Sequence, residues 1–422
     1  MLKQLEGSQG VAHAVALCRP DVVCAYPISP QTHIVEHLGL LCRQGVLENS
    51  EYINVESEFA AMSVAIGASV AGGRAYTATA SQGLLYMAEA IYNAAGLGLP
   101  IVMTVANRAI GAPINIWNDH SDSMSQRDAG WVQLFAEDNQ EAVDLHIQAF
   151  RIAEELSLPV MVCMDGFVLT HAFRRMDIPR QEKVDQFLPP YQPRQVMDPK
   201  NPYSIGAMVG PEAYTEVRYL MNQRLYRALD VVKSVSDRYL NIMGRRAGGL
   251  LTSYCMEDAE ICLIAMGSIV GTMKDAVDEM RAKGIKVGVI SLKVYRPFPA
   301  KELKDAIGQA SKVIVVDRMV GLGAHGALDT DVCHALRGKS LQQYSVIAGL
   351  GGRAVYKKSI HHIVDLAVQD RLPVDRPYFM DLDEELVQHQ MRLEATQIHP
   401  GPMAEALNRE VIKRKIARGE EF

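Results

Sequence analysis

The loop at residues 26–30 (Tyr-Pro-Ile-Ser-Pro) is the first of several segments whose residue types could do chemistry. Its two prolines stiffen the backbone and would hold the Ser29 hydroxyl in a fixed direction, as a hydrogen bond to a bound ligand requires. A structural role is also open, because serine followed by proline is the pattern of a helix N-cap and first turn. The sequence therefore leaves Ser29 as either a ligand contact or the cap of a helix that starts near Pro30.

The pair Glu56-x-Glu58 stands where an expected strand ends and a helix rich in Ala, Ser and Gly begins. Carboxylates at a helix start are favoured by the helix dipole, which would explain both residues without a function. However, Glu58 enters a helix that is uncharged from Phe59 to Gly73. A buried carboxylate needs a partner, and sharing a proton with a ring nitrogen of a ligand would supply one. Both interpretations stay open.

Arg108 follows the most apolar expected strand of the chain. An arginine at the end of a strand suits bidentate binding of a carboxylate or phosphate, and a structural ion pair is the alternative. The next polar loop contains Asp119, His120 and Asp122. These three lack the spacing of well-defined ligand sets, so we expect no metal site there.

Hydroxyl groups alternate at Thr77, Thr79 and Ser81 along another expected strand and beyond its end. They would either line a polar cleft or satisfy backbone groups. Further along, residues 321–326 have the glycine spacing of a nucleotide-binding fingerprint. Because no strand leads directly into these glycines, we expect no nucleotide site there.

A sheet must position these segments, because short apolar runs alternate with helix-like stretches from residue 11 to about residue 170. The alternation predicts a parallel α/β fold, in which the loops that follow the strands meet at one edge and bind ligands. We expect strands at 22–26, 51–55, 74–78, 101–106 and 160–164. We expect helices at 57–71, 83–95 and 139–156, with the small-residue helix at 57–71 buried.

A proline-rich segment and a polar helix at about 211–235 separate this region from a second, smaller α/β region. There we expect strands at 259–266, 286–292 and 312–317, and helices at 270–283 and 300–309. We expect a first α/β domain at residues 1–185, followed by an extended connection with an arm helix at 186–250. A smaller α/β domain at 251–372 and a charged helical tail at 373–422 would complete the chain.

Composition excludes several classes of protein. The 422 residues are 48% hydrophobic and 22% charged, as in a globular chain, and the net charge of −6 gives no overall attraction to nucleic acid. No run reaches the ~18 apolar residues that span a bilayer, and residues 1–10 lack an apolar signal core, so we expect a cytoplasmic protein. The seven cysteines include no CxxC pair, so we expect no iron–sulfur cluster in this chain.

Taken together, these segments resemble the alpha subunit of the 2-oxoacid:ferredoxin oxidoreductases, closest to the pyruvate branch (pyruvate:ferredoxin oxidoreductase, or pyruvate synthase). The resemblance rests on residues 26–30, Glu56-x-Glu58, 79–84 (Thr-Ala-Ser-Gln-Gly-Leu), 107–109 (Asn-Arg-Ala) and 113–120 (Pro-Ile-Asn-Ile-Trp-Asn-Asp-His). Residues 165–167 (Asp-Gly-Phe) and 295–299 (Tyr-Arg-Pro-Phe-Pro) extend it, so that it covers about residues 5 to 365.

The resemblance implies a pyrimidine-type thiamine diphosphate domain, with a parallel sheet, followed by a smaller domain like the C-terminal domain of transketolase. The active site would be shared with a beta subunit that carries the diphosphate, its magnesium and an iron–sulfur cluster, and gamma and delta-type subunits would complete the complex. Glu58 would bond the aminopyrimidine ring nitrogen, with Pro27 and Ile28 beside the cofactor, while Arg108 and Ser29 would bind the substrate carboxylate. No metal ligand is implied in this chain.

The implied reaction is the oxidative decarboxylation of a 2-oxoacid, first of all pyruvate, to acyl-coenzyme A and carbon dioxide, with electrons passed through iron–sulfur clusters to ferredoxin. One residue departs from the family pattern, which usually has threonine where this chain has Ser29. Serine leaves slightly more room, so an aromatic 2-oxoacid such as phenylglyoxylate, with an acceptor such as NAD, is one alternative. A non-catalytic scaffold subunit, in which Glu58 and Arg108 form a structural ion pair, is the other.

Overall fold

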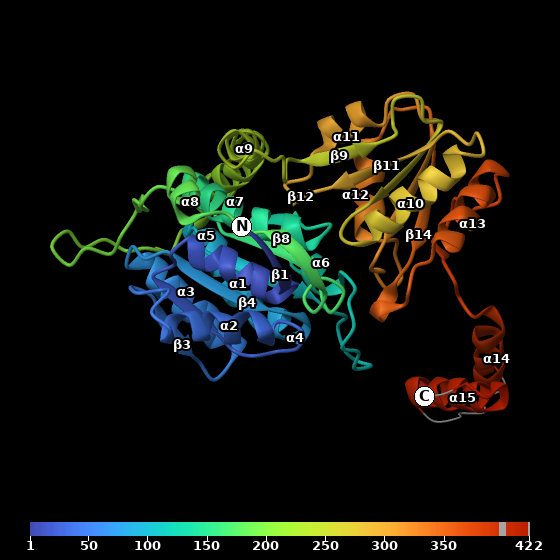
Figure 1. The fold of residues 1–422 in the computed structure, drawn as a ribbon, viewed down its shortest axis with the longest axis horizontal. Coiled ribbons are helices and arrows are strands. Elements are labelled where there is room, and N and C mark those ends of the chain that lie inside the picture. The colour runs from blue at the N-terminus through green and yellow to red at the C-terminus, as the bar shows by residue number, and fades with distance from the viewer. Residues whose placement is uncertain (396–401, 421–422) are drawn as a thin grey trace. The chain divides into compact units, whose positions relative to one another are not determined.

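The computed structural model describes residues 1–395 and 402–420, which form two compact units, Met1–Tyr378 and Phe379–Phe422 (Figure 1). The first unit contains two large sheets with helices packed on them, and the second consists mainly of two helices.

The first large sheet has seven strands in the order β12-β6-β7-β5-β4-β2-β3, and only the β12–β6 pair is antiparallel. Its strands are β2 (Val22–Ala25), β3 (Glu51–Asn54), β4 (Ala75–Thr79), β5 (Val102–Asn107), β6 (Val132–Phe135), β7 (Val160–Asp165) and β12 (Val294–Arg296). Strands β2, β3, β4, β5 and β7 confirm the sequence prediction. Strands β6 and β12 were not predicted, and β12 comes from a much later part of the chain than the other strands of this sheet.

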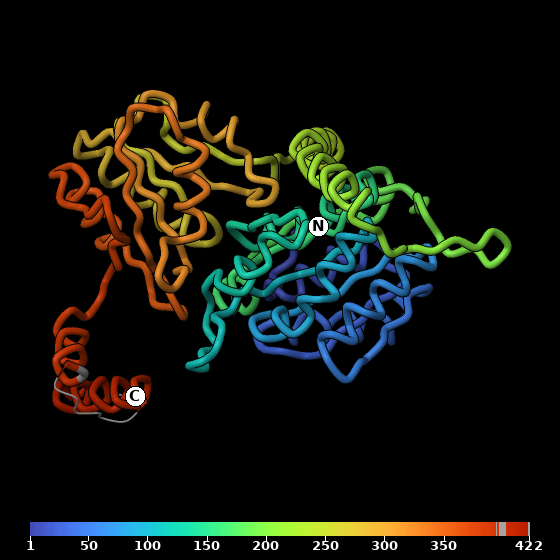
Figure 2. Tube along the Cα trace, turned by 180° about the vertical axis from the view of Figure 1, so that it is seen from behind, coloured from blue at the N-terminus to red at the C-terminus, as the bar shows by residue number. Residues whose placement is uncertain are grey.

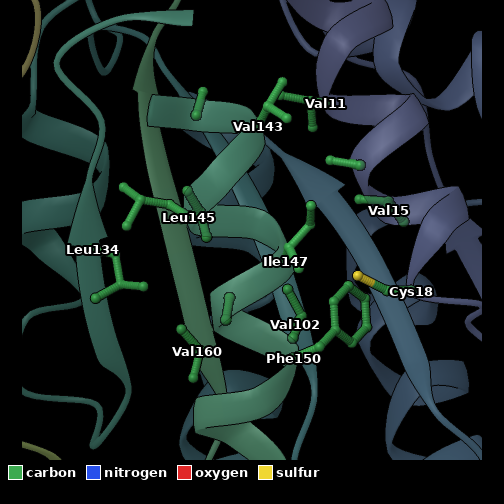
Figure 3. Close-up of a cluster of buried hydrophobic side chains, with 14 of the residues drawn as sticks. Val11, Val15, Cys18, Val102, Leu134, Val143, Leu145, Ile147, Phe150 and Val160 are labelled. Carbon is green, nitrogen blue, oxygen red and sulfur yellow. The ribbon is translucent and has the colours of Figure 1, made fainter. Parts of the chain in front are cut away.

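Helices cover both faces of this sheet. They are α1 (Gly7–Leu17), α2 (Thr32–Arg43) and α7 (Asn139–Leu156) on one face, and α3 (Glu58–Val70), α4 (Ser81–Tyr86) and α5 (Ala88–Leu97) on the other, with the short α6 (Ser121–Ser125) after β5. Figure 3 shows the first face, where Val11 and Val15 of α1 meet Val143 and Ile147 of α7 above the strands. All four side chains are fully buried, as an α/β core requires.

Two predictions for the second face need correction. The helix predicted at 83–95 is divided into α4 and α5, because Met87 leaves the helical conformation (φ −92°, ψ 9°) without any glycine or proline to signal the break. The small-residue helix α3 is buried on one face only, and its opposite face presents Phe59, Ser63 and Gly67 to solvent. Small residues permit close packing of a helix against a neighbour, but that neighbour need not belong to the same chain.

The connection between the two α/β regions contains α8 (Gln181–Phe187), an extended stretch at 188–210 and the long helix α9 (Pro211–Met243). Figures 1 and 2 both show the stretch before α9 as a loop that projects from the first sheet. Helix α9 continues past its predicted end because Val235, Tyr239 and Met243 pack against the first domain, and it ends where Gly244 adopts a left-handed conformation (φ 79°). Its first ten residues are all exposed.

The second large sheet has the order β15-β14-β13-β10-β11-β9, with a parallel centre of β14, β13, β10 and β11 and an antiparallel edge at β9. Its strands are β9 (Leu251–Tyr254), β10 (Ile261–Ala265), β11 (Val287–Leu292), β13 (Lys312–Asp317), β14 (Gln342–Ile347) and β15 (Tyr378–Phe379). The accompanying helices are α10 (Ile269–Arg281), α11 (Ala300–Ala306), α12 (Ala327–Ala335), the 3-10 turn η1 (Leu350–Gly352) and α13 (Lys357–Val368). Strands β10, β11 and β13 and helices α10 and α11 confirm the prediction of a second α/β region.

The two sheets of the first unit are joined by β12, which follows the second sheet's β11 and pairs with β6 of the first. Beside this crossover, the buried Lys293 ammonium group lies 2.8 Å from Glu137 and 2.7 Å from Glu141. A further two-stranded antiparallel sheet pairs β1 (Leu2–Glu6) with β8 (Phe173–Asp177). Loops from both domains are therefore held in fixed positions at the edge of the first sheet.

The charged tail is helical where the structure describes it. It contains α14 (Glu384–Ala395) and α15 (Met403–Arg418), and Arg414 lies 3.2 Å from Asp383. Residues 396–401 and 421–422 of the predicted tail lie outside the described residues. In the described part of the chain, no helix combines the length and apolar character needed to cross a bilayer.

Candidate functional site

The loops after β2 and β5 meet through the side chain of Arg108. Its Nη1 donates a hydrogen bond to the main-chain oxygen of Ser29 at 3.0 Å, and its Nε donates one to the main-chain oxygen of Asn115 at 3.1 Å. Partial burial lowers the pKa of Arg108, an effect opposed by the nearby Asp122 carboxylate. Within residues 1–395 and 402–420, Arg108 forms no ion pair, so the structural pair with Glu58 is not formed.

Ser29 does not cap a helix. Helix α2 begins at Thr32, with Gln31 in the N-cap position, so the helix starts later than the Ser-Pro pattern suggested. The amide of Gln31 donates to the main-chain oxygen of Ala78 at 2.8 Å and ties this loop to β4. The Ser29 side chain is exposed on the residue whose main-chain oxygen contacts Arg108, and its hydroxyl has no partner among the described residues.

Glu58 is the first residue of α3, where its predicted helix start is confirmed by an N-cap hydrogen bond from Ala60 N to the Ser57 hydroxyl at 3.2 Å. Glu58 is only 8% exposed, yet its carboxylate has no hydrogen-bond partner in the part of the chain that the structure describes. A Cβ atom added at Gly83 would lie 2.6 Å from Glu58 Oε1. Glycine at position 83 therefore lets the loop after β4 approach this carboxylate closely.

The hydroxyl groups of β4 are also unpaired. Thr77 and Thr79 are fully buried, and neither Oγ1 atom has a hydrogen-bond partner among the described residues, so they do not satisfy backbone groups. The hydroxyl of Thr79 would lie 2.5 Å from a Cβ atom at Gly83, next to Glu58. Unpaired buried polar groups are rare in native proteins, and here the buried Thr79 hydroxyl lies close to the Glu58 carboxylate at the strand ends.

Asp122 holds the loops after β4 and β5 together. Its Oδ2 accepts hydrogen bonds from Ser81 N at 3.0 Å and Arg108 N at 2.9 Å, and its Oδ1 accepts from Asn107 Nδ2 at 2.8 Å and Ser123 N at 2.7 Å. Complete burial raises the pKa of this carboxyl to about 6, although the four donors act in the opposite direction. The sequence offered Asp122 only as part of a polar loop, because its role depends on two strands that are distant in the chain.

A second buried carboxylate, Asp165, joins the two α/β regions. It accepts hydrogen bonds from His120 Nε2 at 2.9 Å, from Arg318 Nη1 at 2.6 Å and from Ser268 N at 2.8 Å. Burial would raise the pKa of Asp165, but the Arg318 and His120 charges outweigh burial and lower it well below its ordinary range. Arg318 was not singled out in the sequence, since it follows a strand of the other domain.

The residues of the polar loop have separate partners. Asp119 accepts from Ser121 N at 3.0 Å and from Gly351 N at 3.1 Å, whereas His120 binds Asp165. The loop is thus fixed against the turn η1 of the second domain, and its three candidate ligands do not converge on one point.

Pro27 and Ile28 lie in the same loop as Ser29. The Ile28 N–H donates to Gln31 Oε1 at 3.3 Å, and Pro27 lines an open cavity of about 630 Å³ between α2 and the β3 edge. The structure thus brings four of the predicted residues, Pro27, Ile28, Ser29 and Arg108, into adjoining loops, with Glu58 at the neighbouring strand end.

The glycine-rich turn at 321–326 precedes α12, but the amide groups at this helix start are already used. Asp317 Oδ2 accepts from Asp329 N at 2.9 Å, and Asp317 Oδ1 accepts from Leu328 N at 3.3 Å. Burial raises the pKa of Asp317 to about 7. A side chain of the protein therefore occupies the place that a phosphate group would need.

Comparison with known proteins identifies the family that this chain resembles. The family model of the pyruvate flavodoxin/ferredoxin oxidoreductase thiamine diphosphate-binding domain matches residues 13–237, and the model of pyruvate:ferredoxin oxidoreductase core domain II matches residues 259–360. The two matches cover the two α/β regions in order.

Curated relatives are similar over nearly their whole length. The chain is 46% identical over 393 residues to the pyruvate synthase subunit PorA of Methanosarcina barkeri, covering 91% of this chain and 97% of the relative. For the PorA subunit of Pyrococcus abyssi the identity is 40% over 391 residues, covering 91% and 98%. The ketoisovalerate oxidoreductase subunit VorA of Pyrococcus abyssi is also 40% identical, over 354 residues that cover 83% of this chain and 89% of that one.

Solved structures share the fold at low sequence identity. The 2-oxoglutarate:ferredoxin oxidoreductase of Magnetococcus marinus superposes with a TM-score of 0.66 at 18% identity, over 87% of this chain and 65% of that one. A split-gene transketolase superposes with a TM-score of 0.52 at 15% identity, over 89% of this chain and all of that one. These likenesses show that the chain shares the α/β fold of both structures, as the sequence predicts.

Proposed function

Because this chain belongs to the pyruvate:ferredoxin oxidoreductase family, we propose that it is the alpha subunit of a complex that oxidises pyruvate, with Glu58, Arg108 and Ser29 in its active site. The reaction is a thiamine diphosphate-dependent oxidative decarboxylation of a 2-oxoacid, giving acyl-coenzyme A and carbon dioxide, with ferredoxin as the electron acceptor. The subunit works as an enzyme together with its partner chains.

The observation that carries this proposal is the largely buried Glu58 side chain, whose carboxylate has no hydrogen-bond partner among the described residues. A carboxylate of this kind fits the pyrimidine ring of thiamine diphosphate, because a ring nitrogen would supply the partner that the protein does not. When bound, the cofactor supplies an electron sink for decarboxylation. Glu58 would hold and return the proton shared with the ring, and the approach of Gly83 would keep the carboxylate in place.

Arg108 and Ser29 would bind the substrate. The guanidinium group is already oriented by the main-chain oxygens of Ser29 and Asn115, so it loses little freedom when it meets a carboxylate. The exposed Ser29 hydroxyl beside it would add a second hydrogen bond to the same carboxylate. Arg108 would therefore position the 2-oxoacid for reaction. Pro27 and Ile28 would line the cofactor side of this loop.

Exposed apolar side chains near these residues support a site completed by another chain. They include Tyr26, Phe59, Tyr86, Ile114 and Trp117, which are 38%, 38%, 62%, 82% and 51% exposed. Clustered exposed hydrophobic residues are typical of protein interfaces. We infer that a beta subunit covers this face and carries the diphosphate, magnesium and an iron–sulfur cluster, while gamma and delta-type subunits extend the electron path.

The substrate proposed first is pyruvate, because the PorA relatives are named for pyruvate synthase. The similarity to VorA, which is named for ketoisovalerate, makes a branched 2-oxoacid the second candidate. The serine at position 29 does not speak for a scaffold role, and it does not remove substrate binding. Its hydroxyl is still available on the residue that contacts Arg108. The scaffold alternative required an ion pair between Glu58 and Arg108, which is not formed in the part of the chain described.

Two substitutions in the assembled complex test the assigned roles. Arg108→Ala should raise the KM for the 2-oxoacid and lower kcat/KM about 10- to 100-fold, since hydrogen bonds to a charged group contribute about 1.5–3 kcal/mol. Glu58→Gln should lower kcat at least about 100-fold while thiamine diphosphate stays bound, because the shared proton is lost. The exposed neighbour Glu56 gives the matched control, and Glu56→Gln should leave kcat unchanged. Full activity in Glu58→Gln would refute its role.

A further inference from the structure

A row of rings in tilted contact lies near the loops of Ser29 and Arg108. Trp117 packs on Phe167 with ring centroids 4.8 Å apart, Phe167 packs on His171 at 4.7 Å, and His171 packs on His33 at 4.6 Å. Trp117 belongs to the loop that follows Arg108, and His33 lies in the first turn of α2, just after the loop of Ser29. The row therefore connects the two loops that hold the substrate-binding residues.

The row ends at a carboxylate. His33 Nδ1 lies 2.7 Å from Glu6 Oε1, and one ligand atom each from Glu6, His33 and His171 fall within 4.8 Å of one another. We propose that Glu6, His33 and His171 form a binding site for one divalent cation of the zinc type, which joins the start of α2 to the turn after β7. Neither the thiamine reaction nor the comparisons assign such a site, and the proposal does not depend on the proposed function.

The donor set identifies the class of ion. Two imidazole nitrogens and one carboxylate oxygen are typical ligands of Zn²⁺, and ions that prefer oxygen, such as Mg²⁺, are poorly served by imidazole. In a tetrahedral zinc site, neighbouring ligand atoms lie about 3.3 Å apart, given metal distances of about 2.0–2.1 Å. The ligand atoms, now within 4.8 Å of one another, would move closer together, and the ion would replace the hydrogen bond between His33 and Glu6.

The ligands are held by their surroundings, as metal ligands usually are. Glu6 accepts from the Gln9 backbone in the capping box of α1, and the Thr170 hydroxyl lies 2.7 Å from His171 Nδ1. Thr170 is fixed in turn, since its main-chain oxygen accepts from both the N–H and the hydroxyl of Ser8 at 2.8 Å.

Access and neighbouring donors also suit an ion. The Glu6 side chain is only 11% exposed, whereas that of His33 is 47% exposed, so an ion can enter and keep a position open to water. Glu6 and His33 line the open cavity beside α2 together with His37, whose Nε2 is buried without a partner among the described residues. His13 in turn lies against His37, with ring centroids 5.1 Å apart.

The test uses the full-length chain after treatment with a chelator, with ZnCl₂ and MgCl₂ as probes in titration calorimetry and thermal melting. We expect one saturable Zn²⁺ site per chain, a rise in Tm with Zn²⁺ and no such response to Mg²⁺. Glu6→Gln, His33→Ala and His171→Ala should each weaken Zn²⁺ binding at least about 10-fold, as loss of a ligand or its support does. Because His33 is exposed, His33→Ala keeps the test valid if Glu6→Gln disturbs the start of α1.

His325 provides the matched control. It lies 3.1 Å from Asp329 and is 40% exposed, but it forms no group of three ligands within the described residues. His325→Ala should leave Zn²⁺ affinity unchanged. The proposal is overturned if the unaltered chain shows no saturable Zn²⁺ binding, or if the three variants bind Zn²⁺ as tightly as the unaltered chain does. Neither result would bear on the thiamine reaction, because no readout depends on turnover.

Discussion

The substitution Asp122→Asn tests whether this buried carboxylate positions Arg108. All four contacts to Asp122 come from N–H donors, two on each carboxylate oxygen. An asparagine has one oxygen, so its amide nitrogen must face two of these donors and leave them unpaired. If the amide nitrogen replaces Oδ2, the N–H groups of Ser81 and Arg108 lose their acceptor, and the loops after β4 and β5 separate.

The magnitudes indicate a variant that folds but works poorly. Two unpaired buried N–H groups cost about 2–6 kcal/mol, at about 1–3 kcal/mol each. Removing the charge recovers about 3 kcal/mol at neutral pH, since burial raises the pKa of Asp122 from 3.8 to about 6 and each pKa unit is worth about 1.4 kcal/mol. The two effects largely offset each other in stability. A displaced Arg108, by contrast, should lower kcat/KM about 10- to 100-fold.

The pH dependence follows from the same carboxyl. Its pKa is raised in the folded state, so the group stabilises the fold fully below about pH 4, and this contribution is lost as the pH rises through about 6. Activity should depend on pH in the opposite sense. Protonation of Asp122 below about pH 6 removes a hydrogen-bond acceptor from the loops that hold Arg108 and Ser81. We therefore expect kcat/KM of the unaltered complex to fall below about pH 6, and this acidic limb to be absent in Asp122→Asn.

The assay is kcat/KM for the 2-oxoacid between about pH 5 and 8, measured with Tm on the same preparations. Asp128→Asn is the control, since Asp128 is a carboxylate close in sequence that is 71% exposed. The positioning role would be refuted if Asp122→Asn kept both kcat/KM and its acidic limb, or if only its Tm changed.

Two further predictions concern packing. Gly83→Ala should lower kcat at least about 10-fold by displacing Glu58, because the added methyl would lie 2.5 Å from Thr79 Oγ1 and 2.6 Å from Glu58 Oε1. The control is Gly96→Ala, which should leave kcat unchanged because a Cβ atom there has no neighbour within 4 Å. Equal kcat values in both variants would contradict the close approach of Gly83 to Glu58. We also propose that the separate helical unit at residues 379–422 lies across a partner subunit. Its deletion should therefore weaken assembly of the co-expressed complex, as judged by size-exclusion chromatography. An intact truncated complex would disprove that role.

Elements with strong local signals were predictable from the sequence. Helix α7 was predicted at the bounds the structure shows, because Asp138 caps it and its apolar residues recur at helical spacing. Strands β5 and β7 were found because continuous apolar runs mark buried parallel strands. By contrast, nothing local marked the break at Met87 or the crossover strand β12, which depends on pairing with β6.

In the candidate site, too, residues with a local sequence signal could be found, and residues that depend on distant parts of the chain could not. Ser29, Glu58 and Arg108 could be singled out from the sequence because each stands where a loop follows a strand, and their roles stay predictions. The supporting carboxylates could not, because the roles of Asp122 and Asp165 depend on donors from strands and domains that the sequence does not place side by side. The exposed face of α3 was also missed, since a helix of small residues does not reveal which chain it packs against.

The central claim is that this chain contributes to a pyruvate-oxidising thiamine diphosphate site. It is tested most directly by a panel of 2-oxoacids on the natively purified complex, following reduction of a viologen dye with and without coenzyme A. We predict coenzyme A-dependent turnover that is fastest with pyruvate. Preference for a branched or aromatic 2-oxoacid would correct the substrate, and turnover of none by the intact complex would contradict the claim.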